Sequence, residues 1–216
     1  MRFRSTEAGF AVDGVHVLLS NGSSPDTPSA DHWRPMLASF HGVSMEQVRI
    51  DAVRNRPPAA WVAGDRCWLS FSKSRSVRAC AFSPRGPVGV DIEHVQFSPA
   101  LNKAELDHMM ALALAPDELE RCRRASDEAL AFLRIWTAKE AVLKAAGLGL
   151  TVDPRRVRTW VEGGNRATLR DITYDVSTAT TTGTVLSVAT PSPREEAAEA
   201  QRVTPEAPAG VGRRRR

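Results

Sequence analysis

The order of periodic segments constrains the fold most, because a strand-helix-strand succession occurs on each side of about residue 95. In the first part, a strand-like apolar run precedes a segment of helical spacing, and two more strand-like runs follow. These segments are Gly14–Ser20, Trp33–Val43, Trp68–Phe71 and Val77–Phe82. In the second part, helical patterns fill 100–146, the last from Ser126 to Ala146, and strand-like runs occupy 157–163, 167–176 and 182–190. We therefore expect an α+β protein made of two similar halves, a pseudodimer.

The expected divisions of the chain are an N-terminal half over 1–95, a C-terminal half over 96–190 and a disordered tail over 191–216. The tail has too few large apolar groups to pack. It ends in Arg213–Arg216, and without these four arginines the basic and acidic residues are equal in number. A near-neutral folded region argues against a nucleic-acid partner, which would need a basic face or groove.

Composition also bears on location. Cys67, Cys80 and Cys122 form neither a disulfide framework nor a metal-ligand cluster, which favours a reducing, cytoplasmic setting. There is no apolar run of the ~18 residues that a membrane-spanning helix needs. The N-terminal residues lack the apolar core and cleavage site of a signal peptide, so we expect neither export nor membrane insertion.

Two acids share one face of a predicted strand. In PVGVDIEHV, strict alternation places Val90 and Ile92 on one face, and Asp91 and Glu93 on the other. Like charges so placed repel unless a cation lies between them. A half-buried strand with a solvated acidic face would show the same alternation, and that alternative stays open for the strand by itself.

The helix predicted within WTAKEAVLKAAGLGL carries charges on the stripe that should be apolar. Glu140 and Lys144 lie at helical spacings on or beside the stripe of Trp136, and Lys139 lies at its edge. A buried ion pair is an indifferent source of stability, so function explains these charges better. The three carboxylates form a hard oxygen site with two lysine cations around it, of the kind that Mg²⁺ shares with water and phosphate oxygens. The chemistry indicated is transfer or cleavage at a phosphate.

The sequence GVDIE followed by FLRIWTAKEAVLKAAGLGL resembles the 4'-phosphopantetheinyl transferases, in their larger, pseudodimeric Sfp-like branch. LASFHGV, LSFS and APDELE extend the resemblance over roughly residues 15–189. It implies transfer of phosphopantetheine from coenzyme A to a serine of an acyl or peptidyl carrier protein, with release of 3',5'-adenosine bisphosphate. It also implies two related α+β halves with the active site at their junction. We further expect a monomer.

The resemblance assigns roles residue by residue. Asp91, Glu93 and Glu140 match the Mg²⁺-binding acids; Glu140 is the expected base, and Lys144 the second catalytic residue. The expected coenzyme A contacts are Arg34, Arg56, Ser70, Ser72, Lys139 and Lys144. Arg121, Arg123 and Arg124 are candidates for docking an acidic carrier, although a solvated turn would also carry such a run. Which carrier is modified, in fatty-acid, polyketide or peptide synthesis, cannot be read from the chain.

The sequence departs from the family pattern in two places. Phe71 replaces a histidine that helps to hold the 3'-phosphate of coenzyme A, and phenylalanine cannot donate a hydrogen bond. A long arginine-bearing helix is missing between Ser20 and Trp33. These departures leave open a non-catalytic relative that binds carrier proteins. A second alternative is a Mg²⁺-dependent nuclease or phosphodiesterase, because carboxylates and lysine with a metal also suit DNA cleavage.

Overall fold

The structure of the chain is a computed structural model that describes residues 4–6, 9–12, 14–21, 29–53, 56–95, 102–159, 165–181 and 183–193. The expected tail lies outside these residues from residue 194 onward. The strands are β1 (Arg4–Thr6), β2 (Gly9–Val12), β3 (Val15–Asn21), β4 (Val48–Asp51), β5 (Ala59–Val62), β6 (Asp65–Ser74), β7 (Val77–Ser83), β8 (Gly89–His94), β9 (Val157–Thr159), β10 (Arg166–Leu169), β11 (Ile172–Thr180) and β12 (Thr184–Pro191). The α-helices are α1 (Ser29–His41), α3 (Lys103–Ala113), α4 (Pro116–Arg124) and α5 (Glu128–Ala145), and the short 3-10 helices are η1 (Met45–Gln47), η2 (Gly149–Thr151) and η3 (Pro154–Arg156).

The strands form two antiparallel sheets with the same internal topology. The first sheet has the order β1-β2-β3-β7-β6-β5-β4, and the second has the order β8-β12-β11-β10-β9. When β1 and β2 are set aside, each half has a first strand, a helical connection and four further strands. In each sheet the last of these four strands pairs with the first strand, and the other three follow in reverse chain order. This repeated topology confirms the expectation of two similar α+β halves.

The second half begins earlier in the chain than the expected division at residues 95 and 96. Strand β8 pairs with β12 from Gly89 opposite Ala189 to His94 opposite Thr184, so it belongs to the second sheet. In sequence β8 follows β7 closely, which made it look like the last strand of the first half. Strand pairing is a long-range property that the alternation of one strand does not contain.

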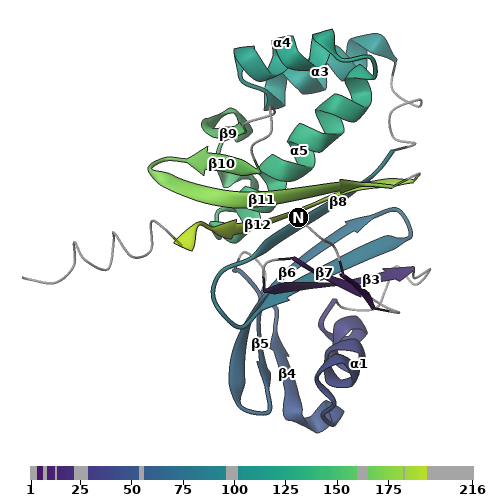
Figure 1. The fold of residues 1–216 in the computed structure, drawn as a ribbon, viewed down its shortest axis with the longest axis vertical. Helices are drawn as coiled ribbons and strands as arrows, with labels where there is room; N and C mark the ends of the chain where they lie inside the picture. The colour runs from purple at the N-terminus through teal and green to yellow at the C-terminus, as the bar shows by residue number, and fades with distance from the viewer. Residues whose placement is uncertain are drawn as a thin grey trace, which may run out of the picture.

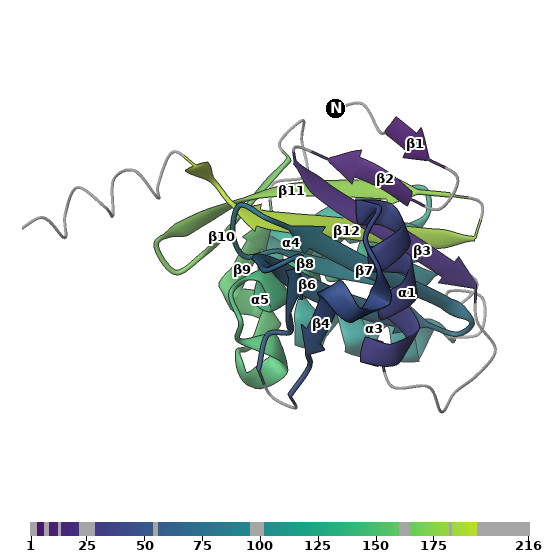
Figure 2. The ribbon, with the colours of Figure 1, turned by 90° about the horizontal axis from the view of Figure 1, so that it is seen from below.

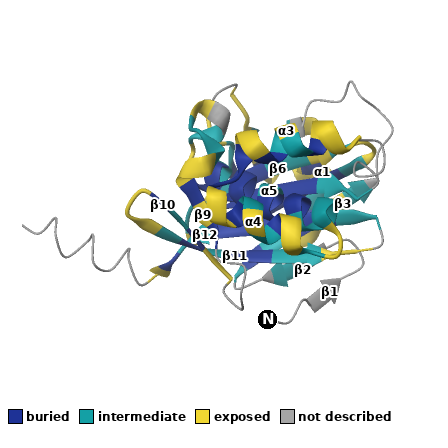
Figure 3. Cartoon of the chain, turned by 90° about the horizontal axis from the view of Figure 1, so that it is seen from above, coloured by how far each residue is buried: buried dark blue, intermediate teal, exposed yellow. Residues whose placement is uncertain are grey.

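The molecule has four layers, helix-sheet-sheet-helix (Figure 1). Helix α1 covers the outer face of the first sheet (Figure 2). Its residues Trp33 and Leu37 belong to one buried apolar cluster with strand residues such as Phe82. The two sheets face each other through a second apolar cluster that includes Val17 and Val90. Helices α3 to α5 cover the second sheet, and exposed positions gather on the outer helices while central strands are buried (Figure 3). No helix among the described residues is long and apolar enough to cross a membrane.

Helix α5 is the longest helix and lies directly on β8. It begins after Asp127, whose carboxylate accepts a hydrogen bond of 2.9 Å from the Leu130 amide and so caps the helix. The expected start of the helical pattern, Ser126, lies one residue before this cap. It ends before Gly147, which adopts a φ of 69° that favours glycine. The close approach to β8 depends on Gly89, because a Cβ there would lie 1.8 Å from the Ala141 carbonyl oxygen. This contact brings the acids of β8 next to the charged stripe of α5.

Candidate functional site

The two acids of β8 lie where α5 and β6 meet that strand. Asp91 is buried, with 5% of its surface exposed, and Glu93 is half-buried. The same alternation that places Gly89 against α5 places Asp91 and Glu93 on that face of the strand. The solvated acidic face that the alternation also allowed is therefore wrong.

Lys144 joins α5 to β8 through its ammonium group. Its Nζ donates hydrogen bonds to Asp91 Oδ1 at 2.7 Å and to the Val90 carbonyl oxygen at 3.0 Å. About a quarter of the side chain stays exposed, which leaves the ammonium accessible from the neighbouring pocket. The amine on the inward stripe thus pairs with an acid of the other element.

Glu140 is buried beside these two residues. Burial, and after it the negative charge of Asp91, raise the pKa of the Glu140 carboxyl to about 7, against the opposing effect of the Lys144 ammonium. Burial also raises the pKa of Glu93, against the hydrogen bond from Ser74. Burial of three neighbouring acids thus explains why the pKa values of both Glu140 and Glu93 are raised.

The acids fit a divalent cation by their chemistry and by their unsatisfied atoms. Within the described part of the chain, Glu140 Oε1 and Asp91 Oδ2 are buried without a hydrogen-bond partner, which normally costs about 1–3 kcal/mol per group. No group of three His, Cys, Asp or Glu side chains among the described residues is already arranged as a metal cage. Mg²⁺ does not need one, since it is usually held by one or two carboxylates, water and substrate phosphates. The two free carboxylate oxygens match that mode.

Three serines of β6 contact β8 from the first half. Ser70 Oγ accepts a hydrogen bond from the Val90 amide at 3.0 Å, and Ser72 Oγ accepts one from the Ile92 amide at 3.2 Å. Ser72 Oγ also donates to Asp91 Oδ1 at 2.8 Å, and Ser74 Oγ donates to Glu93 Oε2 at 2.8 Å. Ser74 was not among the expected site residues; the signal for it was the repetition of serine at every second position of one strand.

A pocket of about 580 Å³ lies between the two halves next to Lys144. Its wall from the first half includes Arg56, Ser70 and Phe71, and its wall from the second half includes Lys144 and Gly147. The complete lining is Arg56, Pro57, Pro58, Leu69, Ser70, Phe71, Lys144, Gly147, Leu148, Gly149 and Thr151. A ligand there would meet two cations and otherwise largely apolar groups.

Phe71 forms part of the apolar wall of this pocket. Its ring stacks on Trp33 of α1 with 6.3 Å between ring centroids and 3° between ring planes. It also packs on the apolar cluster between α1 and the first sheet. The side chain is therefore held in place by the core of the first half.

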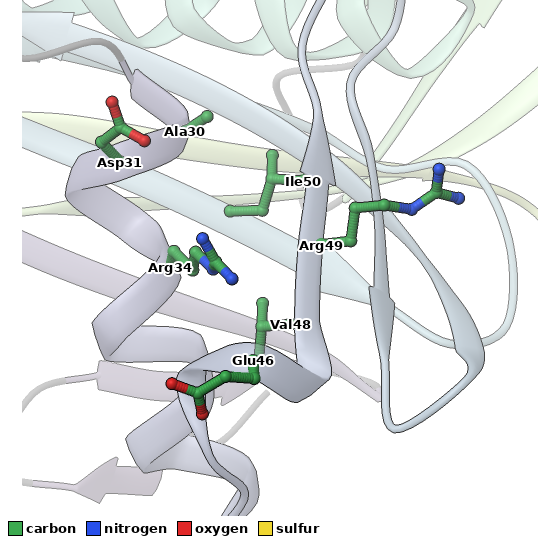
Figure 4. Close-up of a pocket in the computed structure, with 7 residues that line it drawn as sticks. All are labelled: Ala30, Asp31, Arg34, Glu46, Val48, Arg49 and Ile50. Carbon is green, nitrogen blue, oxygen red and sulfur yellow. The ribbon is translucent and has the colours of Figure 1, made fainter.

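Arg34 lies in a different pocket from Arg56 and Lys144. Its Nε donates to the Met45 carbonyl oxygen at 2.9 Å, and its side chain lies between α1 and β4 (Figure 4). That second pocket has a volume of about 300 Å³ and is lined by Ala30, Asp31, Arg34, Glu46, Val48, Arg49 and Ile50. The structure does not bring Arg34 together with the other expected coenzyme A contacts.

Lys139 does not reach the site, and the expectation that it contacts coenzyme A is wrong for this structure. Its side chain is fully buried and forms an ion pair with Glu118 Oε2 at 2.6 Å. The ammonium also donates to the carbonyl oxygens of Pro154 at 3.0 Å and Val157 at 2.6 Å, so its three donors are used. Burial lowers the pKa of Lys139, and the negative charge of Glu118 opposes that shift.

Glu118 is the buried polar residue that sequence reasoning missed. It lies in the first turn of α4, where its Oε2 accepts from the Ala115 amide at 2.8 Å. Its Oε1 accepts from the Thr159 amide and hydroxyl at 2.9 Å and 2.8 Å. Together with Lys139 it ties α4, α5 and β9 into one unit. An acid in a first helical turn ordinarily indicates capping, and it does so here.

The three expected docking arginines lie on α4. Arg121 pairs with Asp117 at 3.2 Å and donates to the Thr159 carbonyl oxygen at 3.1 Å. Arg124 pairs with Glu120 along the same helix, and Arg123 is exposed. These contacts leave docking of a carrier protein as a prediction.

The part of the chain that holds the acids is similar in sequence to known proteins. Residues 87–190 match the sequence model of the 4'-phosphopantetheinyl transferase superfamily. The chain is 30% identical to the 4'-phosphopantetheinyl transferase HetI of Nostoc sp. over 124 residues, which are 54% of this chain and 49% of HetI. It is 35% identical to the 4'-phosphopantetheinyl transferase AcpT of Salmonella typhimurium over 88 residues, which are 41% of this chain and 44% of AcpT.

A solved structure is similar over part of the chain. It is the holo-acyl-carrier-protein synthase AcpS from Neisseria meningitidis, with a TM-score of 0.43 and 21% sequence identity over 49% of this chain and 97% of that chain. The chain spans about half the length of the curated relatives that it matches.

Proposed function

We propose that this chain, whose residues 87–190 match the sequence model of the 4'-phosphopantetheinyl transferase superfamily, transfers the 4'-phosphopantetheine group of coenzyme A to a serine of an acyl or peptidyl carrier protein. The second product is 3',5'-adenosine bisphosphate. We place this activity in the cytoplasm and assign it to a monomer.

The observation that carries the proposal is the position of the acid cluster at the edge of a pocket between the halves. Asp91 pairs with the ammonium of Lys144, Glu93 and Glu140 interact with that ammonium electrostatically, and Lys144 also lines the pocket. A substrate diphosphate beside Lys144 would meet a cation and carboxylates at the same place. Arg56 and Ser70 line the same pocket and are the other candidates for contacting coenzyme A.

Glu140 is suited to take the proton of the attacking hydroxyl. Its carboxyl interacts with both Asp91 and Lys144 at the acid cluster, and a positioned carboxylate can accept a proton in the transition state. In the proposed step Glu140 accepts the proton from the carrier serine, and the serine oxygen forms a bond to the phosphorus that bears the pantetheine group. The bond from that phosphorus to the bridging oxygen breaks, and the electron pair leaves on 3',5'-adenosine bisphosphate. Lys144 offsets the negative charge on the phosphoryl oxygens.

The acids would hold Mg²⁺ through Asp91, Glu93 and Glu140. When bound, the ion supplies positive charge that polarises the phosphoryl oxygens and neutralises the leaving diphosphate oxygen. The unpartnered oxygens of Asp91 and Glu140 support this assignment. The arginines of α4, Arg121, Arg123 and Arg124, are the proposed contacts for an acidic carrier surface.

The test is the mass of an apo carrier protein after incubation with this protein, coenzyme A and Mg²⁺. We expect the carrier to gain the mass of one phosphopantetheine group. Asp91→Ala and Glu140→Ala should abolish most of that gain while the variants remain folded. An unchanged mass with several acyl and peptidyl carriers would contradict the proposed activity.

A further inference from the structure

The serines of β6 form a ladder against the free edge of β8. Because β8 is the first strand in the order of its sheet, one of its edges has no neighbouring strand. The hydroxyls of Ser70, Ser72 and Ser74 accept from the amides of Val90, Ile92 and His94 at 3.0, 3.2 and 3.1 Å. The serine period of two residues matches the period at which amides point outward from that edge. The first half thereby covers an edge that would otherwise expose unpaired donors.

The hydroxyl hydrogens of this ladder point to the acids of the proposed metal site. Ser72 donates to Asp91 Oδ1 and Ser74 donates to Glu93 Oε2, each at 2.8 Å. Each of these serines therefore binds an amide and the carboxylate of the residue just before it. Ser70 binds the amide of Val90, and the residue just before Val90 is Gly89, which has no carboxylate.

These hydrogen bonds decide which carboxylate oxygens remain free. Asp91 Oδ1 accepts from both Ser72 and Lys144, whereas Asp91 Oδ2 is buried without a partner among the described residues. A carboxylate held at one oxygen by two donors cannot rotate without losing both bonds. The free oxygen is therefore presented in one orientation.

We propose that Ser72 and Ser74 are positioning residues that orient Asp91 and Glu93 for the divalent cation, so that the first half completes a metal site whose ligands all belong to the second half. This inference rests on the proposed function only through the assignment of the acids as metal ligands. Outer-shell donors of this kind orient the ligands that hold a metal, and their loss typically weakens metal affinity. It follows that metal affinity depends on contact between the halves.

The test is Mn²⁺ binding, followed by the electron paramagnetic resonance signal of the free ion during titration of the full chain. Ser72→Ala and Ser74→Ala should each weaken Mn²⁺ binding about tenfold, as outer-shell substitutions do in other metal sites. Ser70→Ala is the matched control, because Ser70 makes the same amide contact and no carboxylate contact; its Mn²⁺ affinity should stay within about twofold of the wild type. Ser72→Thr keeps the hydroxyl and should restore affinity.

Thermal unfolding in the presence of EDTA separates positioning from stability. All three alanine variants lose an amide contact and should show a lower Tm, and the decrease should be larger for Ser72→Ala and Ser74→Ala, which also lose a hydrogen bond to a carboxylate. Ser70→Ala should therefore lower Tm without losing metal affinity. If Ser72→Ala fails to fold, Ser72→Cys, which keeps the size but donates only weakly, takes its place. Equal Mn²⁺ affinity in the wild type and in the Ser72 and Ser74 variants would overturn the inference and leave the proposed transferase activity standing. Absence of Mn²⁺ binding by the wild type would overturn the metal assignment itself.

Discussion

The ammonium of Lys144 lies 2.7 Å from Asp91 Oδ1, and the two residues are separated by 53 positions in the sequence. This ion pair puts a positive charge among three acids, where it opposes the rise in the pKa of Glu140 and Glu93. The acid cluster is thus partly compensated by the protein itself. The negative charge of Asp91 on β8 explains why the amine of Lys144 on α5 faces inward.

Lys144→Met should lower both activity and stability. Loss of a cation aimed at phosphoryl oxygens typically reduces kcat about 10²–10³-fold. Breaking a fully buried pair costs roughly 3–5 kcal/mol, and the partial exposure of Lys144 reduces the expected cost to about 1–3 kcal/mol. Lys103→Met is the matched control, because Lys103 pairs with Asp107 and Glu128 at the surface, where solvent screens the ion pairs, and its loss should lower the free energy of unfolding much less. Urea unfolding compares the two, and equal losses would contradict the role of Lys144.

Glu140→Gln should change how stability depends on pH in EDTA. The folded pKa of about 7 lies above the ordinary glutamate value of 4.5, so between these pH values the folded protein holds a proton that the unfolded chain releases. Stability from Glu140 is therefore fully present below about pH 4.5 and is lost as pH rises through about 7. The full loss is at most about 3.5 kcal/mol, at about 1.4 kcal/mol per pH unit. Glutamine carries no charge, so the variant should gain stability relative to the wild type between about pH 4.5 and pH 8.

Chemical denaturation of both proteins at the two pH values measures this difference. A difference between wild type and Glu140→Gln that stays constant with pH would show that Glu140 is not desolvated as described. In the transfer assay the same variant should lose about 10²-fold or more in kcat, because a glutamine cannot accept the proton.

Lys139→Met should destabilise the fold without weakening coenzyme A binding. Removal of the ammonium leaves Glu118 buried without its cation, at a cost of roughly 3–5 kcal/mol. At a temperature where the variant is still folded, KM for coenzyme A should remain within about twofold of the wild-type value. KM rises when a substitution removes a contact to the substrate, and Lys139 makes no such contact here. A large rise in KM with an unchanged Tm would restore Lys139 as a phosphate contact.

Gly89→Ala should prevent the close packing of α5 on β8. The added Cβ would lie 1.8 Å from the Ala141 carbonyl oxygen, and backbone atoms of a helix cannot yield as a flexible side chain can. We expect a loss of more than about 3 kcal/mol, beyond the usual cost of overpacking. Gly183→Ala is the control, because a Cβ there meets nothing within 4 Å, and it should change stability by less than about 0.5 kcal/mol. Thermal unfolding measures both; similar Tm values would contradict the packing described.

Much of the site followed from local patterns. Alternation placed Asp91 and Glu93 on one face of a strand, and helical spacing placed Glu140 and Lys144 on one stripe, because both periods are set by backbone geometry. The repeated strand-helix-strand order likewise predicted the two halves. The boundary at β8 was wrong because one strand's pattern does not say which sheet it joins.

The role of Lys139 could not be read from the helix alone. It is next to Glu140 in sequence, but successive helical residues point about 100° apart, so the two side chains leave α5 in different directions. Whether Lys139 meets solvent or another element depends on where α4 and β9 pack. The buried ion pair with Glu118 places the Lys139 ammonium in the interior of the second half.

The sequence by itself determined which residues are strand or helix and which side chains share a face, since these depend on neighbours within a few positions. It also carried the acids and lysines on which the family resemblance rests. Only the tertiary structure decided which faces meet. The missing Cβ of Gly89 lets α5 approach β8, and the serines of β6 reach across from the other half to Asp91 and Glu93. Such contacts join residues far apart in sequence, so their energies have no local signature in the chain.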